Sequence, residues 1–409
     1  MKVAVVGAGA AGTIAAIFAA EAGAEVLLLE RTGDGGRKIL ISGGGRCNIL
    51  PSQVEETRFV TDSSPHTLRN MLRSWPLGEQ IAFFQRELKL TLVEETETRK
   101  LFPSSNRARD VRDGLLAALK RRGGELISHA VVTGLSPQNG RWRIEWENRQ
   151  PLEVDVVILA SGGLSVPQTG SDGTGIRIAR SLGLTIEPTY AALTPITAVP
   201  APFGDLSGIS LEVELTAESD SRSARARGGF LFTHRGYSGP AVLDVSHVLV
   251  RAHMEGMPAR LLVQWSLDAA AWEQALAPTG TRSLLGAVRR ALPERLAIAL
   301  IGRAGVEAER PLAQLRREER QRLITELVRC ELPWSGHEGY KKAEVTGGGV
   351  SLAEVDPRTM ESRRCPGLFL CGEILDAFGP IGGYNFLWAW ATGRAAGQGV
   401  ALKSSVLSP

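Results

Sequence analysis

The chain has 409 residues, of which 43% are hydrophobic and 22% are charged. This composition is that of a folded protein with two or three domains, and it excludes a disordered or fibrous chain. The net charge of +3 is too small to indicate nucleic-acid binding by itself.

The first 30 residues predict a βαβ unit. Residues 2–6 form a short apolar run typical of a buried parallel strand, 11–22 are Ala-rich and helical, and 25–30 form a second strand. Glu21 interrupts the apolar run, which argues against a signal peptide. No stretch of about 18 uninterrupted apolar residues occurs, so we expect no membrane span.

A glycine-dense loop follows at 33–48. Apolar residues spaced three and four apart predict a helix over 66–90, and another is expected over 110–122 with Asp110 as its cap. Short strands are expected within 125–147. Residues 153–160 read as a buried strand that ends at a Ser-Gly-Gly turn.

The pattern changes after Pro188. Residues 193–263 alternate as antiparallel strands, 268–330 are helical, 341–352 are strand-like, and 367–400 return to strand, Gly-rich turn and helix, the helix starting near Tyr384. The sequence therefore predicts an α/β fold with a Rossmann-like domain (1–190 and 346–409). A β-barrel-like insert (191–266 and 333–345) and a helical domain (267–332) interrupt it.

A dinucleotide-binding fingerprint opens the chain. The GAGAAG segment at 7–12 follows the first strand and begins a helix, where Gly7, Gly9 and Gly12 would give a tight turn, access for a pyrophosphate and close packing. Glu30 ends the second strand, where a carboxylate accepts hydrogen bonds from a ribose diol. The alternative is a Gly-rich turn without a ligand.

The C-terminal segment favours FAD over NAD. A strand ends at Gly372 and Glu373, and Gly382 and Gly383 form a turn before the last helix. In flavoproteins of the glutathione-reductase type such a segment completes the FAD site, because a helix N-terminus stabilises negative charge on the reduced flavin. The run VVILASGG at 156–163 agrees, since it is similar to a strand end near FAD in that superfamily.

Several long motifs resemble one family, the BaiN/RdsA-type NAD(P)/FAD-dependent oxidoreductases, also called YhiN-like or aminoacetone-oxidase-like. They are RKILISGGGRCN (37–48), LFPSSNRARDV (101–111), THRGYSGPAVLDVS (233–246), KAEVTGGGVSLAEVDPRTMES (342–362) and GLFLCGEILDAFGPIGGYNFLWAWATGRAAG (367–397). The resemblance runs from residue 3 to about 400. It implies bound FAD and a fold of three domains. Members of the family are linked to amine oxidation, bile-acid reduction and reduction of uridine to dihydrouridine in 23S ribosomal RNA.

Together, the fingerprint and the resemblance imply a set of cofactor-binding residues: Gly7, Gly9, Ala10, Ala11, Gly12, Glu30, Arg31, Arg37, Lys38, Ser42, Gly43, Gly44, Gly45, Asn48, Val131, Ala160, Ser161, Gly162, Gly372, Glu373, Gly382, Gly383, Tyr384 and Asn385. Cys47 and Arg46 are the catalytic candidates. A thiol near a flavin is able to donate a proton beside the carbon that receives hydride. The alternatives are a small buried residue for Cys47 and a structural ion pair for Arg46.

Other candidates are less specific. One group either meets substrate or fixes a turn of the insert, and it consists of His234, Arg235 and Tyr237. A second group is either a phosphate-facing patch or a set of solvated charges, and it consists of Arg99, Lys100, Lys341 and Lys342. No second GxGxxG follows a strand in the insert, so NAD(P)H is expected to bind transiently. The four Cys residues form no CxxC pair and suit a reducing cytoplasm, and no metal-binding motif occurs.

Three functions remain open. The first is hydride transfer from NAD(P)H through FAD to an unsaturated substrate, with uridine in ribosomal RNA as the best candidate. The second is oxidation of small amines by oxygen, which a closed acidic pocket would favour. The third is a non-catalytic FAD-binding factor associated with RNA.

Overall fold

The computed structural model describes the backbone of residues 1–407 and the side chains as far as Lys403, so the last residues of the predicted first domain lie outside it. Contacts between residues divide the chain into two units. Unit 1 comprises Met1–Ala191 with Glu344–Pro409, and unit 2 comprises Ala192–Ala343. The division of unit 2 into a β-rich and a helical domain stays a prediction.

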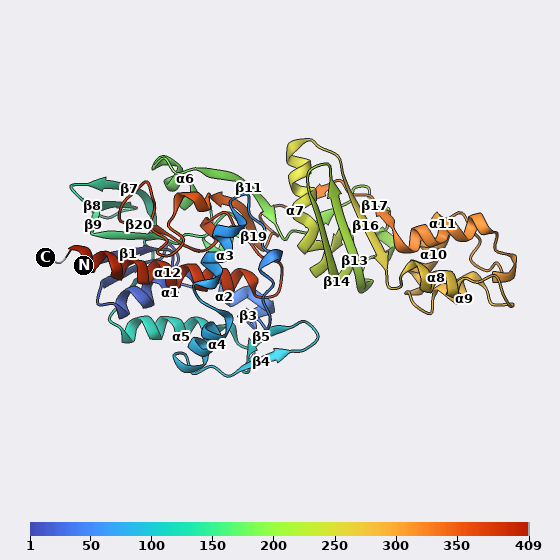
Figure 1. Cartoon of the computed structure of the whole chain (residues 1–409), viewed down its shortest axis with the longest axis horizontal. Coiled ribbons are helices and arrows are strands. Elements are labelled where there is room, and N and C mark those ends of the chain that lie inside the picture. The colour runs from blue at the N-terminus through green and yellow to red at the C-terminus, as the bar shows by residue number, and fades with distance from the viewer. Residues whose placement is uncertain (408–409) are drawn as a thin grey trace. The chain divides into compact units, whose positions relative to one another are not determined.

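A five-stranded parallel sheet forms the centre of unit 1 (Figure 1). Its strands lie in the order β20-β10-β1-β2-β6, with the bounds β1 Lys2–Val6, β2 Glu25–Leu29, β6 Glu125–Ile127, β10 Val156–Leu159 and β20 Leu368–Leu370. The middle strands are buried apolar runs, as a parallel sheet covered on both faces requires. The two ends of the chain therefore build one sheet.

Two helices pack closely beside this sheet, α1 (Ala10–Glu21) and α12 (Tyr384–Leu407). A Cβ atom at Gly393 would lie 2.5 Å from the carbonyl oxygen of Ala11, and one at Gly397 would lie 2.5 Å from that of Ala15. Only glycine fits at such a distance. The first and last helices of unit 1 are thus in backbone contact.

Smaller elements complete unit 1. They are the helices α2 Arg37–Ile41, α3 Pro65–Arg73, α4 Leu77–Arg86, α5 Ala108–Arg121 and α6 Thr174–Ser181. Three small sheets accompany them, made of β3 Leu50–Pro51, β5 Lys100–Pro103 and β4 Leu92–Glu95; of β7 Val132–Gln138, β8 Arg141–Trp146 and β9 Leu152–Val154; and of β11 Ile186–Ala192 with β19 Val345–Val350.

The structure corrects four details of the prediction. Within 193–263, where only strands were expected, Pro240–Glu255 form the helix α7. The single strand expected over 153–160 is two strands, β9 and β10, which belong to different sheets.

The helix expected over 66–90 is two helices, because Pro76, which has no N–H to donate, begins a new helix as its N-cap. Asp110 does not cap α5: Arg107 is the N-cap, and Asp110 lies in the first turn, where its charge suits the helix dipole.

In unit 2, the predicted β-barrel-like insert is a seven-stranded antiparallel sheet in the order β17-β16-β13-β14-β15-β12-β18. Helix α7 (Pro240–Glu255) packs against β13, β14 and β16. The strands are β12 Ile196–Thr197, β13 Ser210–Ser219, β14 Ser223–Thr233, β15 Gly236–Ser238, β16 Ala259–Trp265, β17 Cys330–Leu332 and β18 Gly336–His337. The helical segment between β16 and β17 contains α8 Ala269–Ala275, α9 Leu284–Val288, α10 Glu294–Arg303 and α11 Arg317–Val328.

No helix within residues 1–407 is both long enough and apolar enough to cross a membrane. In the same part of the chain, no group of three or more His, Cys, Asp or Glu side chains is arranged to hold a metal ion.

Candidate functional site

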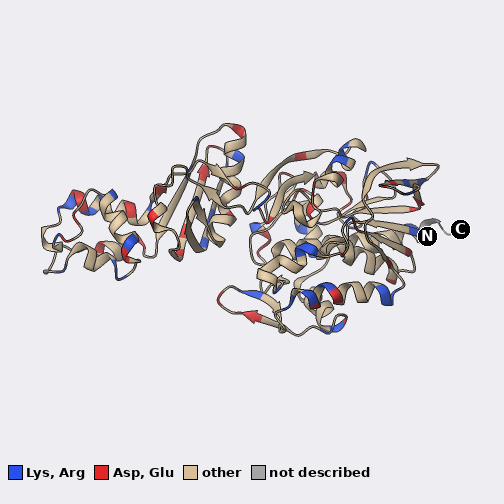
Figure 2. Cartoon of the chain, turned by 180° about the vertical axis from the view of Figure 1, so that it is seen from behind, with Lys and Arg blue, Asp and Glu red and all other residues tan. Residues whose placement is uncertain are grey.

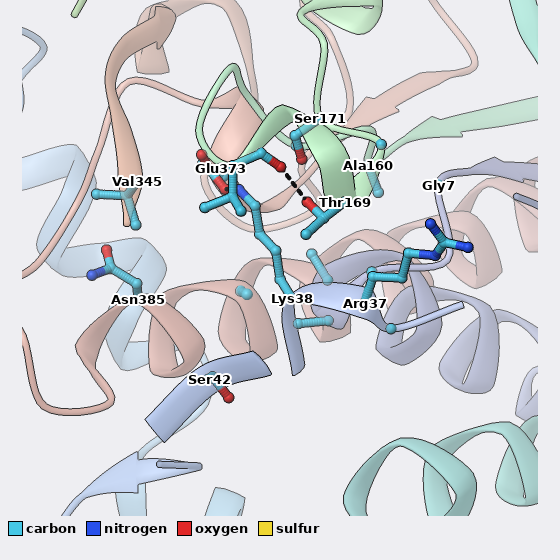
Figure 3. A pocket seen from close by; sticks show the side chains of 18 of the residues that line it. Gly7, Arg37, Lys38, Ser42, Ala160, Thr169, Ser171, Val345, Glu373 and Asn385 are labelled. Atoms are coloured by element: carbon cyan, nitrogen blue, oxygen red, sulfur yellow. Dashed lines mark hydrogen bonds and ion pairs between the residues drawn. The ribbon is translucent and has the colours of Figure 1, made fainter. Parts of the chain in front are cut away.

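A cavity of about 550 Å³ lies in unit 1. Its wall is built from segments far apart in the sequence: the turn between β1 and α1, the loop and helix of residues 36–48, the loop after β10, and the turn before α12. Figure 3 shows Gly7 and Asn385 on opposite sides of this cavity, with Lys38 between them. The volume is that of a site for a cofactor or a small ligand.

The three glycines of the turn between β1 and α1 have different roles. Gly7 and Gly12 are required by close backbone packing, whereas Gly9 leaves space open beside the cavity. A Cβ atom would lie 2.6 Å from the carbonyl oxygen of Ala160 if placed on Gly7, and 1.9 Å from that of Gly7 if placed on Gly12. Gly9 has no atom within 4 Å of its Cβ position and lines the cavity. Space beside the N-terminus of α1 suits a pyrophosphate.

Glu30 is held in place by its neighbours at the end of β2. One carboxylate oxygen accepts from the Ala8 N–H at 3.0 Å, and the other accepts from the N–H and hydroxyl of Thr32 at 2.8 and 2.7 Å. The side chain also lines the cavity. A carboxylate oxygen is able to accept two hydrogen bonds, and the oxygen that faces Ala8 accepts one, so Glu30 retains capacity for a ribose diol.

Beyond Glu30, an ion pair joins two segments of the wall. The Arg31 guanidinium lies 2.6 Å from a carboxylate oxygen of Asp172 and donates to the carbonyl of Gly170 at 3.3 Å. Burial would raise the pKa of Asp172, but the hydrogen bonds from Arg31 and Thr174 lower it to about 2. Asp172 therefore stays ionised and ties the loop after β10 to the end of β2.

Lys38 and Glu373 line the cavity and form a polar cluster with the buried Ser165. The Lys38 ammonium donates to the Ser165 hydroxyl at 2.6 Å and to Glu373 Oε2 at 2.5 Å, and the Ser165 hydroxyl donates to Glu373 Oε1 at 2.6 Å. The N–H of Thr346 also donates to Oε1, at 3.0 Å. Figure 3 shows Lys38 extended toward Glu373. The cluster fixes both charged side chains where a cofactor would contact them.

The loop at 42–48 owes its shape to left-handed backbone at Gly43, Gly44, Gly45 and Cys47, with φ of 55°, 68°, 86° and 61°. Gly44 has no atom within 4 Å of its Cβ position. This opening allows a flat ligand to approach the backbone.

The two catalytic candidates differ in exposure. The Cys47 side chain is fully buried, and burial raises the pKa of its thiol to about 12. The Arg46 guanidinium lines the cavity, lies 4.2 Å from the centre of the Phe102 ring and pairs with Glu95 at 3.1 Å. These surroundings favour the packing alternative for Cys47, while Arg46 is in an ion pair and also faces the ligand space.

The turn before α12 is tied to the 42–48 loop. Gly382 and Gly383 have φ of 118° and 92°, and a Cβ atom on Gly383 would lie 2.5 Å from the carbonyl carbon of Leu50. The Asn48 amide, in the orientation that satisfies both its atoms, accepts from the Gly383 N–H at 2.9 Å. The Asn385 amide pairs with both the N–H and the C=O of Gly379, each at 2.9 Å.

The structure brings most of the predicted residues to one cavity. Twenty-one of the 26 cofactor-binding and catalytic candidates line it: Gly7, Gly9, Ala10, Ala11, Glu30, Arg31, Arg37, Lys38, Ser42, Gly43, Gly44, Arg46, Asn48, Val131, Ala160, Ser161, Gly162, Glu373, Gly382, Gly383 and Asn385.

The other five of these 26 lie outside that lining: Gly12, Gly45, Cys47, Gly372 and Tyr384. Two of them have evident packing roles. A Cβ atom on Gly372 would lie 2.6 Å from that of Ala11, and the Tyr384 hydroxyl donates to the carbonyl of Gln53 at 3.3 Å.

Other residues that line the cavity were not predicted from the sequence. Thr169–Asp172, Phe102 and Val345 were not singled out, and Lys100 was treated as part of a charged patch rather than a cavity. Phe102 and Val345 lie within the motifs at 101–111 and 342–362, and the Gly-rich run at 170–175 is the local signal for the loop at Thr169–Asp172. In unit 2, Tyr237 is buried beside Phe230 and donates to the carbonyl of Pro333 at 2.9 Å, an arrangement that fixes the sheet.

The residues present fit FAD. Its pyrophosphate matches the space beside Gly9, and its adenosine ribose matches Glu30. Ser161 Oγ supplies independent support, because it is buried without a hydrogen-bond partner among the described residues and Ser161 lines the cavity. A buried hydroxyl without a partner is costly, and a polar ligand would satisfy it.

One family model matches nearly the full length of the chain. Residues 1–399 match the model described as "HI0933-like protein Rossmann domain". An Escherichia coli (strain K12) protein named "Ribosomal RNA dihydrouridine synthase" is 33% identical over 98% of both chains. A Clostridium scindens protein named "3-dehydro-bile acid delta(4,6)-reductase" is 30% identical over 98% of this chain and 99% of that one.

Among solved structures, 3-ketosteroid delta1-dehydrogenase from Sterolibacterium denitrificans has a TM-score of 0.51 at 14% identity, covering 98% of this chain and 99% of that one. At this identity the likeness shows the fold alone. The fold class predicted from the sequence, a Rossmann-type FAD-binding α/β fold, is confirmed.

Proposed function

The chain belongs to the HI0933-like family and is a flavin-dependent oxidoreductase, and we propose that it transfers hydride from NADH or NADPH, by way of bound FAD, to a conjugated carbon–carbon double bond. The best candidate for that bond is C5–C6 of uridine in 23S ribosomal RNA, which would give dihydrouridine.

The observation that carries the proposal is the cavity of unit 1. It joins the Gly9 opening, Glu30, the 42–48 loop and the turn before α12 in one continuous wall. Glu30 would bind the adenosine ribose, Gly9, Ala10 and Ala11 the pyrophosphate, and the 42–48 loop and the turn at Gly382 the ring system. When bound, FAD would supply reversible two-electron chemistry.

The names of the relatives support reduction of a double bond as the reaction. Dihydrouridine has two hydrogens more than uridine, and a delta(4,6)-reductase acts on double bonds of a steroid. The chain is 33% identical to the first relative and 30% identical to the second, a difference too small to favour one substrate over the other. Ribosomal RNA is favoured here because two relatives, from Escherichia coli and Haemophilus influenzae, bear that name.

The charges of the cavity do not favour amine oxidation. Its lining contains five cationic residues and four carboxylates: Arg31, Arg37, Lys38, Arg46 and Lys100 against Glu30, Asp172, Glu344 and Glu373. A cationic amine would be better served by an acidic excess. Figure 2 shows basic and acidic residues interleaved along both units, so RNA recognition would rest on local contacts more than on net charge.

The test uses purified protein loaded with FAD, NADH or NADPH, and ribosomal RNA from a strain that lacks the gene. Nucleoside mass spectrometry should find new dihydrouridine, dependent on both protein and reductant. Absence of dihydrouridine, with reduction of a steroid enone under the same conditions, would move the proposal to a small substrate. Bound FAD that neither nucleotide reduces would favour a non-catalytic factor.

A further inference from the structure

Most cations of the cavity wall are already neutralised by a neighbour. Arg31 pairs with Asp172 at 2.6 Å, Arg37 with Asp34 at 3.0 Å, Lys38 with Glu373 at 2.5 Å and Arg46 with Glu95 at 3.1 Å. These four side chains have local partners before any ligand binds.

Lys100 is the exception. It begins β5 and lines the cavity, and within the described residues no ion pair joins its ammonium to a carboxylate. Its aliphatic stem lies along the turn before α12, since Lys100 Cε is 3.7 Å from the Cβ position of Gly382. The cation is thus placed at the end of the cavity where the last helix begins.

The carboxylate opposite Lys100 on the neighbouring strand is engaged by other residues. Glu95 is the cross-strand partner of Lys100 in the β4–β5 pair. Its Oε1 accepts from Arg46 at 3.1 Å and its Oε2 accepts from the Thr98 hydroxyl at 2.5 Å. Hydrogen bonds from Thr98 and Arg46 lower the pKa of Glu95, and Lys100 adds only a weaker, longer-range effect.

A partly buried cation without a counter-charge favours a ligand that carries negative charge. The FAD pyrophosphate does not meet this need, because it is expected beside Gly7 and Gly9. Figure 3 shows Gly7 across the cavity from Asn385, which lies in the first turn of α12. The remaining sources of negative charge are the flavin ring after reduction and a phosphate of the substrate.

We propose that the Lys100 ammonium is the counter-charge for the negative charge that the bound flavin gains on two-electron reduction, and that it thereby sets the reduction potential of the cofactor. The inference rests on the proposed function, since it requires bound FAD. Hydride from NAD(P)H supplies both electrons, and Lys100 only favours the reduced state and gives up no proton.

The experiment measures the reduction potential of FAD bound to the full chain, without substrate, for wild type, Lys100→Met, Lys100→Arg and Lys120→Met. Lys120 is an exposed cation on α5 that does not line the cavity. Lys100→Met should disfavour the reduced form at least tenfold, a shift of about 30 mV to more negative potential. Lys100→Arg and Lys120→Met should stay close to wild type.

A potential unchanged in Lys100→Met overturns the inference. So does a variant whose potential is unchanged but whose affinity for an RNA oligonucleotide falls, because that outcome assigns Lys100 to a substrate phosphate. The FAD dissociation constant, measured in parallel, separates this failure from that of the proposed function. If wild type itself binds no FAD, the proposed function fails; if it binds FAD and only the shift is missing, the inference alone fails.

Discussion

At the residue scale, a few side chains and glycines decide whether the cavity accepts a dinucleotide. Glu30, Lys38 and Glu373 line it and are fixed by neighbours that belong to other elements. Gly9 matters through the absence of a side chain, because the space at its Cβ position is open.

Gly9→Leu should therefore strongly weaken FAD binding without unfolding the chain. Gly9 has φ of −78°, which any residue adopts, so the new side chain would occupy the ligand space and not strain the backbone. We expect at least about a 100-fold loss of FAD affinity, or about 3 kcal/mol, measured by flavin fluorescence. Gly78→Leu, at an exposed helical site with no atom within 4 Å, is the matched control. Equal FAD affinity in the two variants would place the cofactor elsewhere.

The buried carboxyl of Asp376 should make the stability of the fold depend on pH. Burial raises the pKa of this carboxyl to about 6, although the hydroxyls of Ser63 and Thr61 and the N–H groups of Asp62 and Ser63 donate to it. Its pKa in the unfolded chain is about 3.9. Between these values the folded state binds a proton that the unfolded state has lost, so stability falls as pH rises from about 4 to about 6 and then levels off.

Asp376→Asn should remove this contribution, which amounts to at most about 3 kcal/mol for a two-unit shift. The measurement is denaturant unfolding of wild type and variant at several pH values. The difference between their unfolding free energies should change between pH 4 and 6 and be constant above. A difference independent of pH would mean that Asp376 is ionised throughout.

Some residues of the cavity could be predicted from the sequence and others could not. Glu30 and Gly9 were predictable, because the fingerprint fixes their distance along the chain. Lys100 and Asp172 were not, because they reach the cavity only through strand pairing and loop packing between distant segments. Cys47 was predicted to be near the flavin, but a sequence does not show whether a thiol faces a cavity or the core.

At the element scale, the contact between α1 and α12 holds the N-terminal and C-terminal parts of unit 1 together. The sequence predicted both helices, including a start near Tyr384 for the second. It did not predict their contact, which depends on Gly393 and Gly397 lying against the backbone of α1. The predicted helix over 66–90 was wrong in its continuity, because Pro76 divides it.

Gly397→Leu should separate these helices. Its Cβ would lie 2.5 Å from the carbonyl oxygen of Ala15 and 2.8 Å from the Cβ of Phe18, so packing must shift. We expect a loss of about 3 kcal/mol in unfolding free energy, despite the better helix propensity of Leu. Gln398→Leu changes the next, exposed position of the same helix and should be nearly neutral. Similar stability of the two variants would show that the helices are not in close contact.

At the scale of the whole molecule, one sheet built from both ends of the chain carries the cofactor cavity, and unit 2 is inserted between them. The sequence predicted this return, because the strand, turn and helix of 367–400 repeat the character of the N-terminus. The substrate could not be predicted in the same way, since it depends on which ligand fits a surface that no motif encodes.

We propose that this flavoenzyme reduces uridine in ribosomal RNA. The most direct test of this proposal is the dihydrouridine content of 23S ribosomal RNA in a strain lacking the gene, by nucleoside mass spectrometry, with complementation by wild type and by Gly9→Leu. If the proposal is right, a dihydrouridine site is lost in the deletion strain, returns with wild type and does not return with Gly9→Leu. An unchanged dihydrouridine content in the deletion strain would contradict it.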